Sequence, residues 1–194
     1  VVVAALLHLA AAEAPAVFRV EFQTTVDAYP ASFVVEVTRS WAPLGADRFY
    51  ELVQEGYYND NGFFRVVPGF VVQFGLAADP QMTAKWRIPI DDDPVLQSNV
   101  QGTVSFATSG PNSRTTQLFV NLGDNAGLDG QGFAPFGRVV ADGMRVVRAI
   151  NDEYRQSPQQ GHITSNGNSY LHANFPNLDY TTTVALEQDH AEAV

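Results

Sequence analysis

The sequence of 194 residues contains no cysteine and only one lysine, Lys85. The absence of cysteine excludes disulfides, zinc–thiolate sites and a thiol nucleophile. Basic residues are also few, 11 against 21 acidic residues, which gives a formal net charge of -10. A surface of this sign repels phosphate, so we expect no binding to nucleic acid or to anionic lipid. A membrane-spanning helix needs ~20 apolar residues; the apolar run at the start of the sequence is shorter, so no integral membrane segment is expected.

What the composition does supply is enough apolar material for one globular domain. Hydrophobic residues make up 45% of the chain and aromatic residues 11%. A domain of this length buries roughly 70% of its unfolded surface, so it needs neither disulfides nor metal to hold a core. There are no repeats and no low-complexity linker. We therefore expect one domain at residues 15–187 and a polar tail at 188–194.

Residues 1–14 differ from the rest, because they are apolar and rich in alanine, and Pro15 ends them. The pattern resembles the hydrophobic region of a signal peptide followed by a small-residue cleavage site, without the basic segment that usually comes first. As a signal-peptide remnant it predicts an exported, periplasmic or organelle-lumenal protein. As a simple N-terminal extension it predicts a cytoplasmic one.

Alternation of apolar and polar residues predicts a series of short strands. In residues 17–26, Phe18, Val20 and Phe22 share one face, which is the period of a half-buried strand. The same reasoning predicts strands at 32–38, 63–67, 70–74, 103–107, 118–122, 136–140 and 180–186. Many short strands separated by Gly, Pro, Asn and Asp favour a barrel or a sandwich.

Apolar residues at helical spacing predict two helices. The first starts near Pro43, a residue suited to the first turn, and ends at Gly56, a C-cap residue. Its core-facing stripe consists of Phe49, Leu52 and Val53. The second helix is expected at residues 143–150.

Three segments carry more information than periodicity: FFRVVPGFVVQFG at 63–75, GTVSFATSGPNSRTTQLFVNL at 102–122 and GLDGQGFAPFGRV at 127–139. Together they resemble the cyclophilin family of peptidyl-prolyl cis–trans isomerases, and the likeness covers residues 17–186. The resemblance implies a mainly β fold, a closed eight-stranded antiparallel β-barrel capped by two α-helices, with the active groove on the outer face of the barrel. It also implies a folding catalyst that acts on proline-containing polypeptides as a monomer, with no cofactor and no metal.

The resemblance assigns site residues position by position. Arg65 matches the family's catalytic arginine, and Phe70, Gln73 and Phe119 complete the catalytic set. Phe70 and Phe119 would form walls of the proline pocket together with Leu128. The substrate-binding positions that it implies are Val71, Ala107, Thr108, Gln117, Leu128 and Phe133.

The sequence departs from the family pattern around one turn. Gly127 stands where the family often has a tryptophan, whose indole N–H contacts cyclosporin, and this argues against cyclosporin-type binding. A histidine often follows the turn; here no histidine is in register, and Phe133 would fill that side of the pocket. The polar loop at 112–116 matches a region that borders the groove and helps to select the residues before proline.

The chemistry explains why an arginine suits this task. Rotation about an X–Pro bond has a barrier of ~18–20 kcal/mol because the amide loses resonance, and no bond is made or broken. At the twisted state the prolyl nitrogen becomes an acceptor, and the guanidinium of Arg65 is a fixed, charged donor. A 10⁵-fold acceleration needs ~7 kcal/mol, whereas one preorganised donor supplies ~2.7–4 kcal/mol. The rest must come from the pocket, so Arg65, Phe70, Gln73 and Phe119 are expected to meet in one exposed, shallow groove.

Other interpretations are open on the sequence alone. The altered turn at 127–135 would also fit a non-catalytic proline-peptide-binding or chaperone-like module, and a structural subunit would show a large apolar surface patch. The run Asp91–Asp92–Asp93 lacks the alternating ligands of an EF-hand, so a solvated acidic loop is favoured over a calcium site. Ser105, Asp129 and His162 lack the G-x-S-x-G context of a hydrolase, and the histidines lack metal-ligand spacing.

Overall fold

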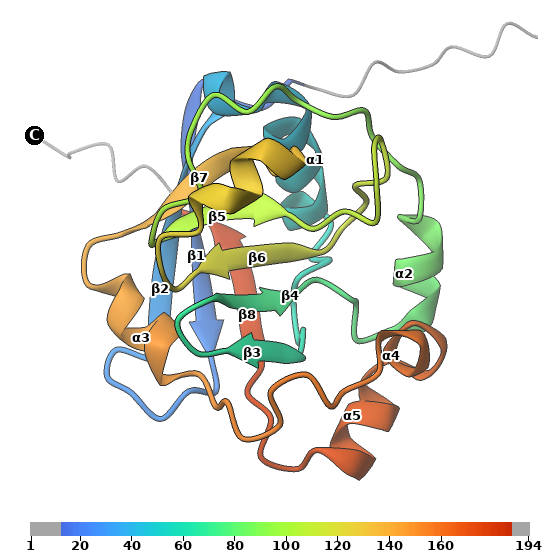
Figure 1. The fold of residues 1–194 in the computed structure, drawn as a ribbon. Helices are drawn as coiled ribbons and strands as arrows, with labels where there is room; N and C mark the ends of the chain where they lie inside the picture. Colours follow the sequence, from blue (N-terminus) through green and yellow to red (C-terminus); the bar gives the residue numbers. More distant parts are fainter. Residues whose placement is uncertain (1–12, 188–194) are drawn as a thin grey trace, which may run out of the picture.

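The structure is a computed structural model that describes residues 13–187. Eight strands form one sheet in the order β3-β4-β6-β5-β7-β2-β1-β8, and each neighbouring pair is antiparallel (Figure 1). Their bounds are β1 Val17–Thr24, β2 Ser32–Thr38, β3 Arg65–Val67, β4 Val71–Phe74, β5 Thr103–Phe106, β6 Leu118–Asn121, β7 Pro135–Val140 and β8 Thr181–Leu186. Every strand predicted from the sequence is present. Residues 1–12 of the expected leader and the tail at 188–194 lie outside the described residues.

The sheet curls into a half-barrel but does not close, so the closed barrel expected above is wrong. The end strands β3 and β8 share no ladder, and one isolated bridge, Gly62 to Tyr180, links their neighbourhoods. The physical reason lies at the outer edge of β3. This strand has three residues, and the N–H of Val66 donates to the carbonyl of Arg155 at 2.9 Å instead of to a strand of the sheet.

The two predicted helices are confirmed as α1 Pro43–Gln54 and α3 Gly143–Ala149, but the expected number of helices is too low. Within residues 13–187 there are also α2 Pro80–Lys85, α4 Gln160–Asn166 and α5 Asn168–Asn174, and the 3-10 turns η1 Arg39–Trp41 and η2 Ala126–Gln131. These helices have six or seven residues each and mostly polar sequences, so they present no apolar stripe long enough to detect. No helix in the described part of the chain is long and apolar enough to cross a membrane.

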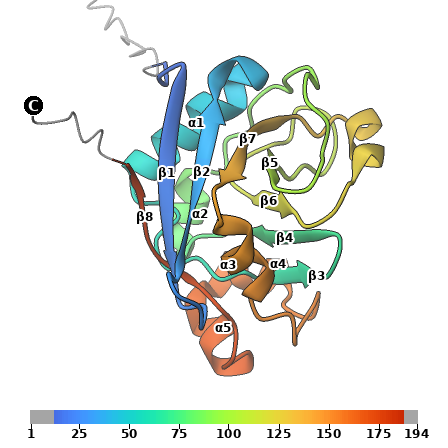
Figure 2. The same ribbon diagram turned by 90° about the vertical axis from the view of Figure 1, so that its left-hand side faces the viewer.

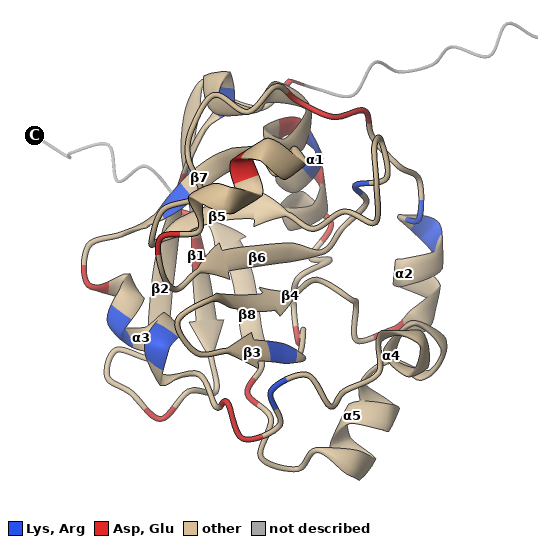
Figure 3. Ribbon diagram, viewed as in Figure 1, with Lys and Arg blue, Asp and Glu red and all other residues tan. Residues whose placement is uncertain are grey.

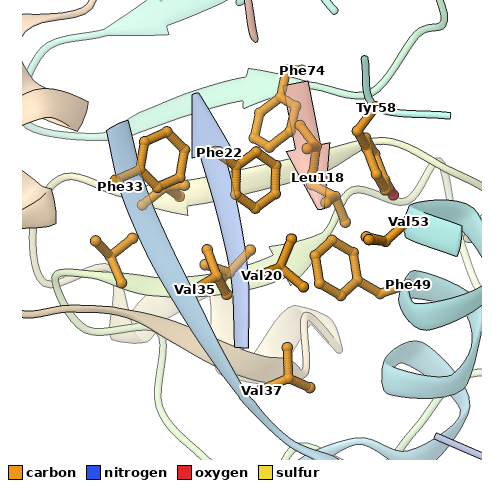
Figure 4. Close-up of a cluster of buried hydrophobic side chains, with 14 of the residues drawn as sticks. Val20, Phe22, Phe33, Val35, Val37, Phe49, Val53, Tyr58, Phe74 and Leu118 are labelled. Atoms are coloured by element: carbon orange, nitrogen blue, oxygen red, sulfur yellow. The ribbon is translucent and has the colours of Figure 1, made fainter. Parts of the chain in front are cut away.

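The main core lies inside the curl of the sheet. The inward residues of β1 and β2 alternate as predicted, and the rings of Phe22 and Phe33 stack 4.9 Å apart (Figure 4). Helix α1 closes one side of this core with Phe49, Leu52 and Val53, all buried. Figure 2 shows the long strands β1, β2 and β8 running beside one another with α5 below them.

A second, smaller core holds α4 and α5 beside β3 (Figure 1). Its fully buried members are Phe64, Leu76, Ile163, Leu171 and Leu178. Because Phe64 immediately precedes β3 and Leu76 follows β4, this cluster fixes the segment 154–174 against the strands that carry Arg65 and Gln73.

The acidic run at 91–93 is only partly the solvated loop that was expected. Asp93 is buried, and its carboxylate accepts the N–H groups of Leu44 at 3.0 Å and Gly45 at 2.9 Å. It also pairs with the buried Arg114 at 3.1 Å. The backbone amides at the start of α1 and the buried guanidinium both need an anion, which explains why one aspartate of the three turns inward.

Candidate active site

Four side chains form a row across strands β3, β4, β6 and β5. Arg65 lies opposite Gln73, Gln73 opposite Phe119, and Phe119 opposite Ser105. Directly opposite residues share one face of a sheet. The residues that alternate with them point into the main core: Val66, Val72, Val120 and Val104. The row therefore lies on the outer face of the half-barrel.

The guanidinium of Arg65 is held from three sides. Its Nη1 donates to Oε1 of Gln73 at 3.1 Å, and its Nε donates to Oε1 of Gln156 at 2.9 Å. Its Cζ lies 5.7 Å from the centre of the Phe70 ring. The side chain is half-buried, so it is fixed in place yet still open to a ligand.

Both acceptors of Arg65 are neutral amides, which leaves its charge uncompensated. Arg65 forms no ion pair with a carboxylate of residues 13–187, whereas Arg39 pairs with Asp47 at 2.7 Å and Arg114 pairs with Asp93. In Figure 3, β4 and β6 carry no charged residue, and β3 carries one positive residue. Within residues 13–187, a chain with a net charge of -10 thus presents a cation without a carboxylate partner on strands that carry no other charge.

A relay of amides continues from Arg65 into a groove. Nε2 of Gln73 donates to Oε1 of Gln117 at 2.8 Å, which fixes the orientation of the Gln73 amide. The carbonyl of Gln117 accepts the N–H of Ala107 at 2.9 Å. Gln73, Ala107, Thr108 and Gln117 line one groove of about 440 Å³, together with hydroxyl groups of the 109–116 loop and Gln160 and Thr164 of α4.

The predicted apolar residues lie at several points along the row. The rings of Phe119 and Phe133 meet edge to face with centres 5.5 Å apart. The N–H of Phe133, which follows the η2 turn, donates to the carbonyl of Leu128 within that turn at 3.4 Å. Val71, two residues before Gln73 on β4, shares its outer face. The structure thus brings the predicted polar residues together along Arg65, Gln73 and Gln117, with Phe70 beside Arg65 and Phe133 beside Phe119.

Sequence reasoning missed the network that supports these walls. The side-chain amide of Asn99 donates to the carbonyl of Phe133 and to Asp129, both at 2.8 Å. Asn125 donates to the carbonyl of Phe70 at 2.9 Å and to Asn121 at 2.8 Å. The signal available was the fully buried asparagine at the end of the apolar strand LFVN, since such a residue needs polar partners.

The pKa of Asp129 reflects this network. Burial alone would raise it, but hydrogen bonds from the Ser98 hydroxyl at 2.5 Å and from Asn99 hold the pKa below its ordinary value. Asp129 therefore stays ionised and anchors the turn that carries Leu128 and Phe133.

The structure does not assemble the hydrolase triad or the metal site that the sequence analysis considered. The hydroxyl of Ser105 donates to Asn99 at 2.9 Å, and His162 lies on α4 against the ring of Tyr170, so Ser105, Asp129 and His162 do not form a triad. Across residues 13–187, no three His, Cys, Asp or Glu side chains are grouped so that they could share a metal ion.

Comparisons with known proteins agree with the family resemblance of the sequence. The family model for cyclophilin type peptidyl-prolyl cis-trans isomerase/CLD matches residues 19–168. A peptidyl-prolyl cis-trans isomerase-like 1 of Aspergillus niger is 37% identical over 131 residues, which cover 64% of this chain and 78% of the relative. A peptidyl-prolyl cis-trans isomerase A of Dickeya dadantii is 41% identical over 117 residues, covering 57% of this chain and 60% of the relative.

Solved structures support the fold. The crystal structure of a Cryptosporidium parvum cyclophilin type peptidyl-prolyl cis-trans isomerase has a TM-score of 0.63 and 18% identity, covering 89% of this chain and 99% of the other. A second structure of that protein, determined in the presence of the dipeptide Ala-Pro, has a TM-score of 0.64 at 18% identity, covering 88% and 99%.

The mainly β half-barrel and the family match define an isomerase of X–Pro peptide bonds. The chain belongs to the cyclophilin-type peptidyl-prolyl cis–trans isomerase family.

Proposed function

We propose that this enzyme catalyses rotation about X–Pro bonds of extended or unfolded polypeptides, with Arg65 as the group that stabilises the rotating amide. The observation that supports this most is the position of its guanidinium. Two neutral amides, Gln73 and Gln156, hold it at 3.1 and 2.9 Å, and its charge is not paired with a carboxylate of residues 13–187.

The reaction needs only this kind of group. When the C–N bond twists, the amide loses resonance and the prolyl nitrogen regains a lone pair. The N–H groups of Arg65 that Gln73 and Gln156 leave unused can donate to that nitrogen. Because the planar amide offers no such acceptor, the interaction favours the twisted state over the ground state, which is the condition for catalysis.

The neighbouring residues would hold the substrate while the bond rotates. Phe70, Phe119 and Leu128 would pack on the proline ring, with Val71 and Phe133 completing the apolar wall. Gln73 would bind the swinging carbonyl oxygen. The N–H of Ala107 is already bonded to Gln117, so its carbonyl and the backbone of Thr108 are the groups left to pair with an extended substrate.

The groove beyond Gln73 would receive residues before proline. It is lined by hydroxyl and amide side chains with one charged residue, Arg87. This lining favours polar side chains, acidic ones included, over large apolar ones.

The decisive experiment replaces Arg65. In a protease-coupled assay with a proline tetrapeptide, Arg65→Ala is expected to lower kcat/KM at least tenfold, because one preorganised donor is worth ~2.7–4 kcal/mol. Circular dichroism should show an unchanged fold, since Arg65 lies on the outer face. Arg138→Ala is the matched control, because that exposed arginine of β7 pairs with Glu36 of β2 and does not line the groove. Full activity of Arg65→Ala would refute the proposal.

A further inference from the structure

We infer that Gln156 is a positioning residue for Arg65, an inference that rests on the proposed role of Arg65. Gln156 lies 91 residues along the chain from Arg65, and its Oε1 accepts the Nε–H of the guanidinium at 2.9 Å. It belongs to the segment between α3 and α4, which contributes no strand to the sheet. This segment therefore holds the site from outside the sheet.

The backbone around Gln156 is tied to β3. Its neighbour Arg155 accepts the N–H of Val66, the residue next to Arg65, at 2.9 Å. A turn closes the segment, because the N–H of Ser157 donates to the carbonyl of Tyr154 at 2.8 Å. Tyr154 packs against Phe175 of the second core, with ring centres 5.1 Å apart. The backbone that carries Gln156 is thus held in place by hydrogen bonds and by packing on the second core, although the Gln156 side chain is exposed.

The two acceptors, Gln73 and Gln156, together fix the orientation of the Arg65 guanidinium, which one acceptor would not. Gln73 binds Nη1 and leaves the guanidinium free to rotate about that contact. The second bond, from Nε to Gln156, fixes the plane of the guanidinium, and the Phe70 ring covers one side of it. The orientation of the unused N–H groups on Nη1 and Nη2 is then fixed, which is the preorganisation that an electrostatic catalyst needs.

The amide at position 156 affects the electrostatics of Arg65 differently from a carboxylate. A glutamate at 156 could accept the same hydrogen bond, but its negative charge would pair with the guanidinium and weaken the field offered to the prolyl nitrogen. The surface is rich in acidic residues, yet both positions that contact the Arg65 N–H groups carry glutamine. Neutral acceptors orient the guanidinium without offsetting the positive field that it offers to the prolyl nitrogen.

The test compares variants of two neighbouring glutamines. Gln156→Ala is expected to lower kcat about three- to tenfold with little change in KM, the range for loss of one exposed hydrogen bond. Gln159→Ala is the matched control, because the Gln159 amide lines the same hollow as Gln156 but donates to the carbonyl of Ser157 and forms no hydrogen bond with Arg65. Gln156→Glu should lose more activity than Gln156→Ala at low salt and recover part of it at high salt, because salt screens the new charge.

A double-mutant cycle separates positioning from a structural role. In the Arg65→Ala background, Gln156→Ala should cause no further loss, because there is no guanidinium left to position. Additive losses, or a Gln156→Ala enzyme as active as wild type, would overturn the inference while leaving the role of Arg65 intact. Full activity of Arg65→Ala would instead refute the proposed function itself.

Discussion

Arg65 and Gln73 occupy opposite positions on β3 and β4, and the guanidinium donates to the amide oxygen at 3.1 Å. The amide nitrogen of Gln73 is bonded to Gln117 at 2.8 Å, so the oxygen can only face the arginine. The orientation of Gln73 is therefore set by its two neighbours, and Gln73 links the cation to the polar groove.

Replacing Gln73 by leucine tests this link. Gln73→Leu keeps a similar volume but removes the acceptor from Arg65 and the donor to Gln117. A hydrogen bond to a charged group is worth ~1.5–3 kcal/mol, so kcat/KM should fall about tenfold or more. Gln23→Leu, an exposed position on β1, serves as the control in the same peptide assay. Equal activity of the two variants would contradict the role of Gln73.

Asp93 should be a stability residue, not a ligand for calcium. Asp93→Ala removes an anion that binds two amides of α1, and it leaves the buried Arg114 with a longer ion pair, 3.4 Å, to the more exposed Asp92. Losing one partner of a buried pair costs about 3–5 kcal/mol, which urea denaturation would measure. Asp91→Ala is the control, because Asp91 is exposed and contacts Arg114 through its backbone carbonyl. A loss below about 0.5 kcal/mol for Asp93→Ala, the usual range for surface changes, would disprove the prediction.

Asp129 predicts a pH dependence of stability. Its folded-state pKa is lowered, so its carboxylate stabilises the fold at pH values above the unfolded pKa of ~3.9. This contribution is lost as the pH falls through the lower folded value. The difference in urea midpoint between wild type and Asp129→Asn should be constant from pH 7 to about pH 5 and shrink toward pH 3.

The control for that series is Asp142→Asn, since the Asp142 carboxylate makes no hydrogen bond or ion pair in the part of the chain that the structure describes. The same trend with pH in both variants would show that the hydrogen bonds of Asp129 are not its source.

Gly127 offers a gain-of-function test. A Cβ added at Gly127 would meet no atom within 4 Å, and the same holds at Gly130. Gly127→Trp would introduce the indole that the family resemblance implies at this position, and it should tighten competition by cyclosporin at least about tenfold, or ~1.4 kcal/mol. Gly130→Trp adds the same ring at the wrong place. Equal inhibition of wild type and Gly127→Trp would contradict the expectation that an indole at this position governs cyclosporin binding.

Much of the fold follows from local pattern, and the site follows only in part. The bounds of β2 and the stripe of Phe49, Leu52 and Val53 match the prediction because burial imposes a fixed period on each element. No such period marks Gln156, whose contact with Arg65 spans 91 residues. It depends on the packing of the second core.

The same limit explains the burial of Asp93 and the open sheet. Nothing within the run Asp91–Asp92–Asp93 says which carboxylate turns inward, because its partners lie on α1 and at Arg114. The open edge is likewise a tertiary result, since the N–H of Val66 bonds to Arg155 and not to β8.

The open edge at β3 has a consequence for local opening of the structure. β3 is a terminal strand of three residues, laddered to β4 alone, and such peripheral elements open locally without global unfolding. Arg65 therefore lies on a strand with low local stability. Deuterium should replace the amide proton of Val66 sooner than those of the central strand β5, and its uptake would report directly on undocking of the 154–157 turn.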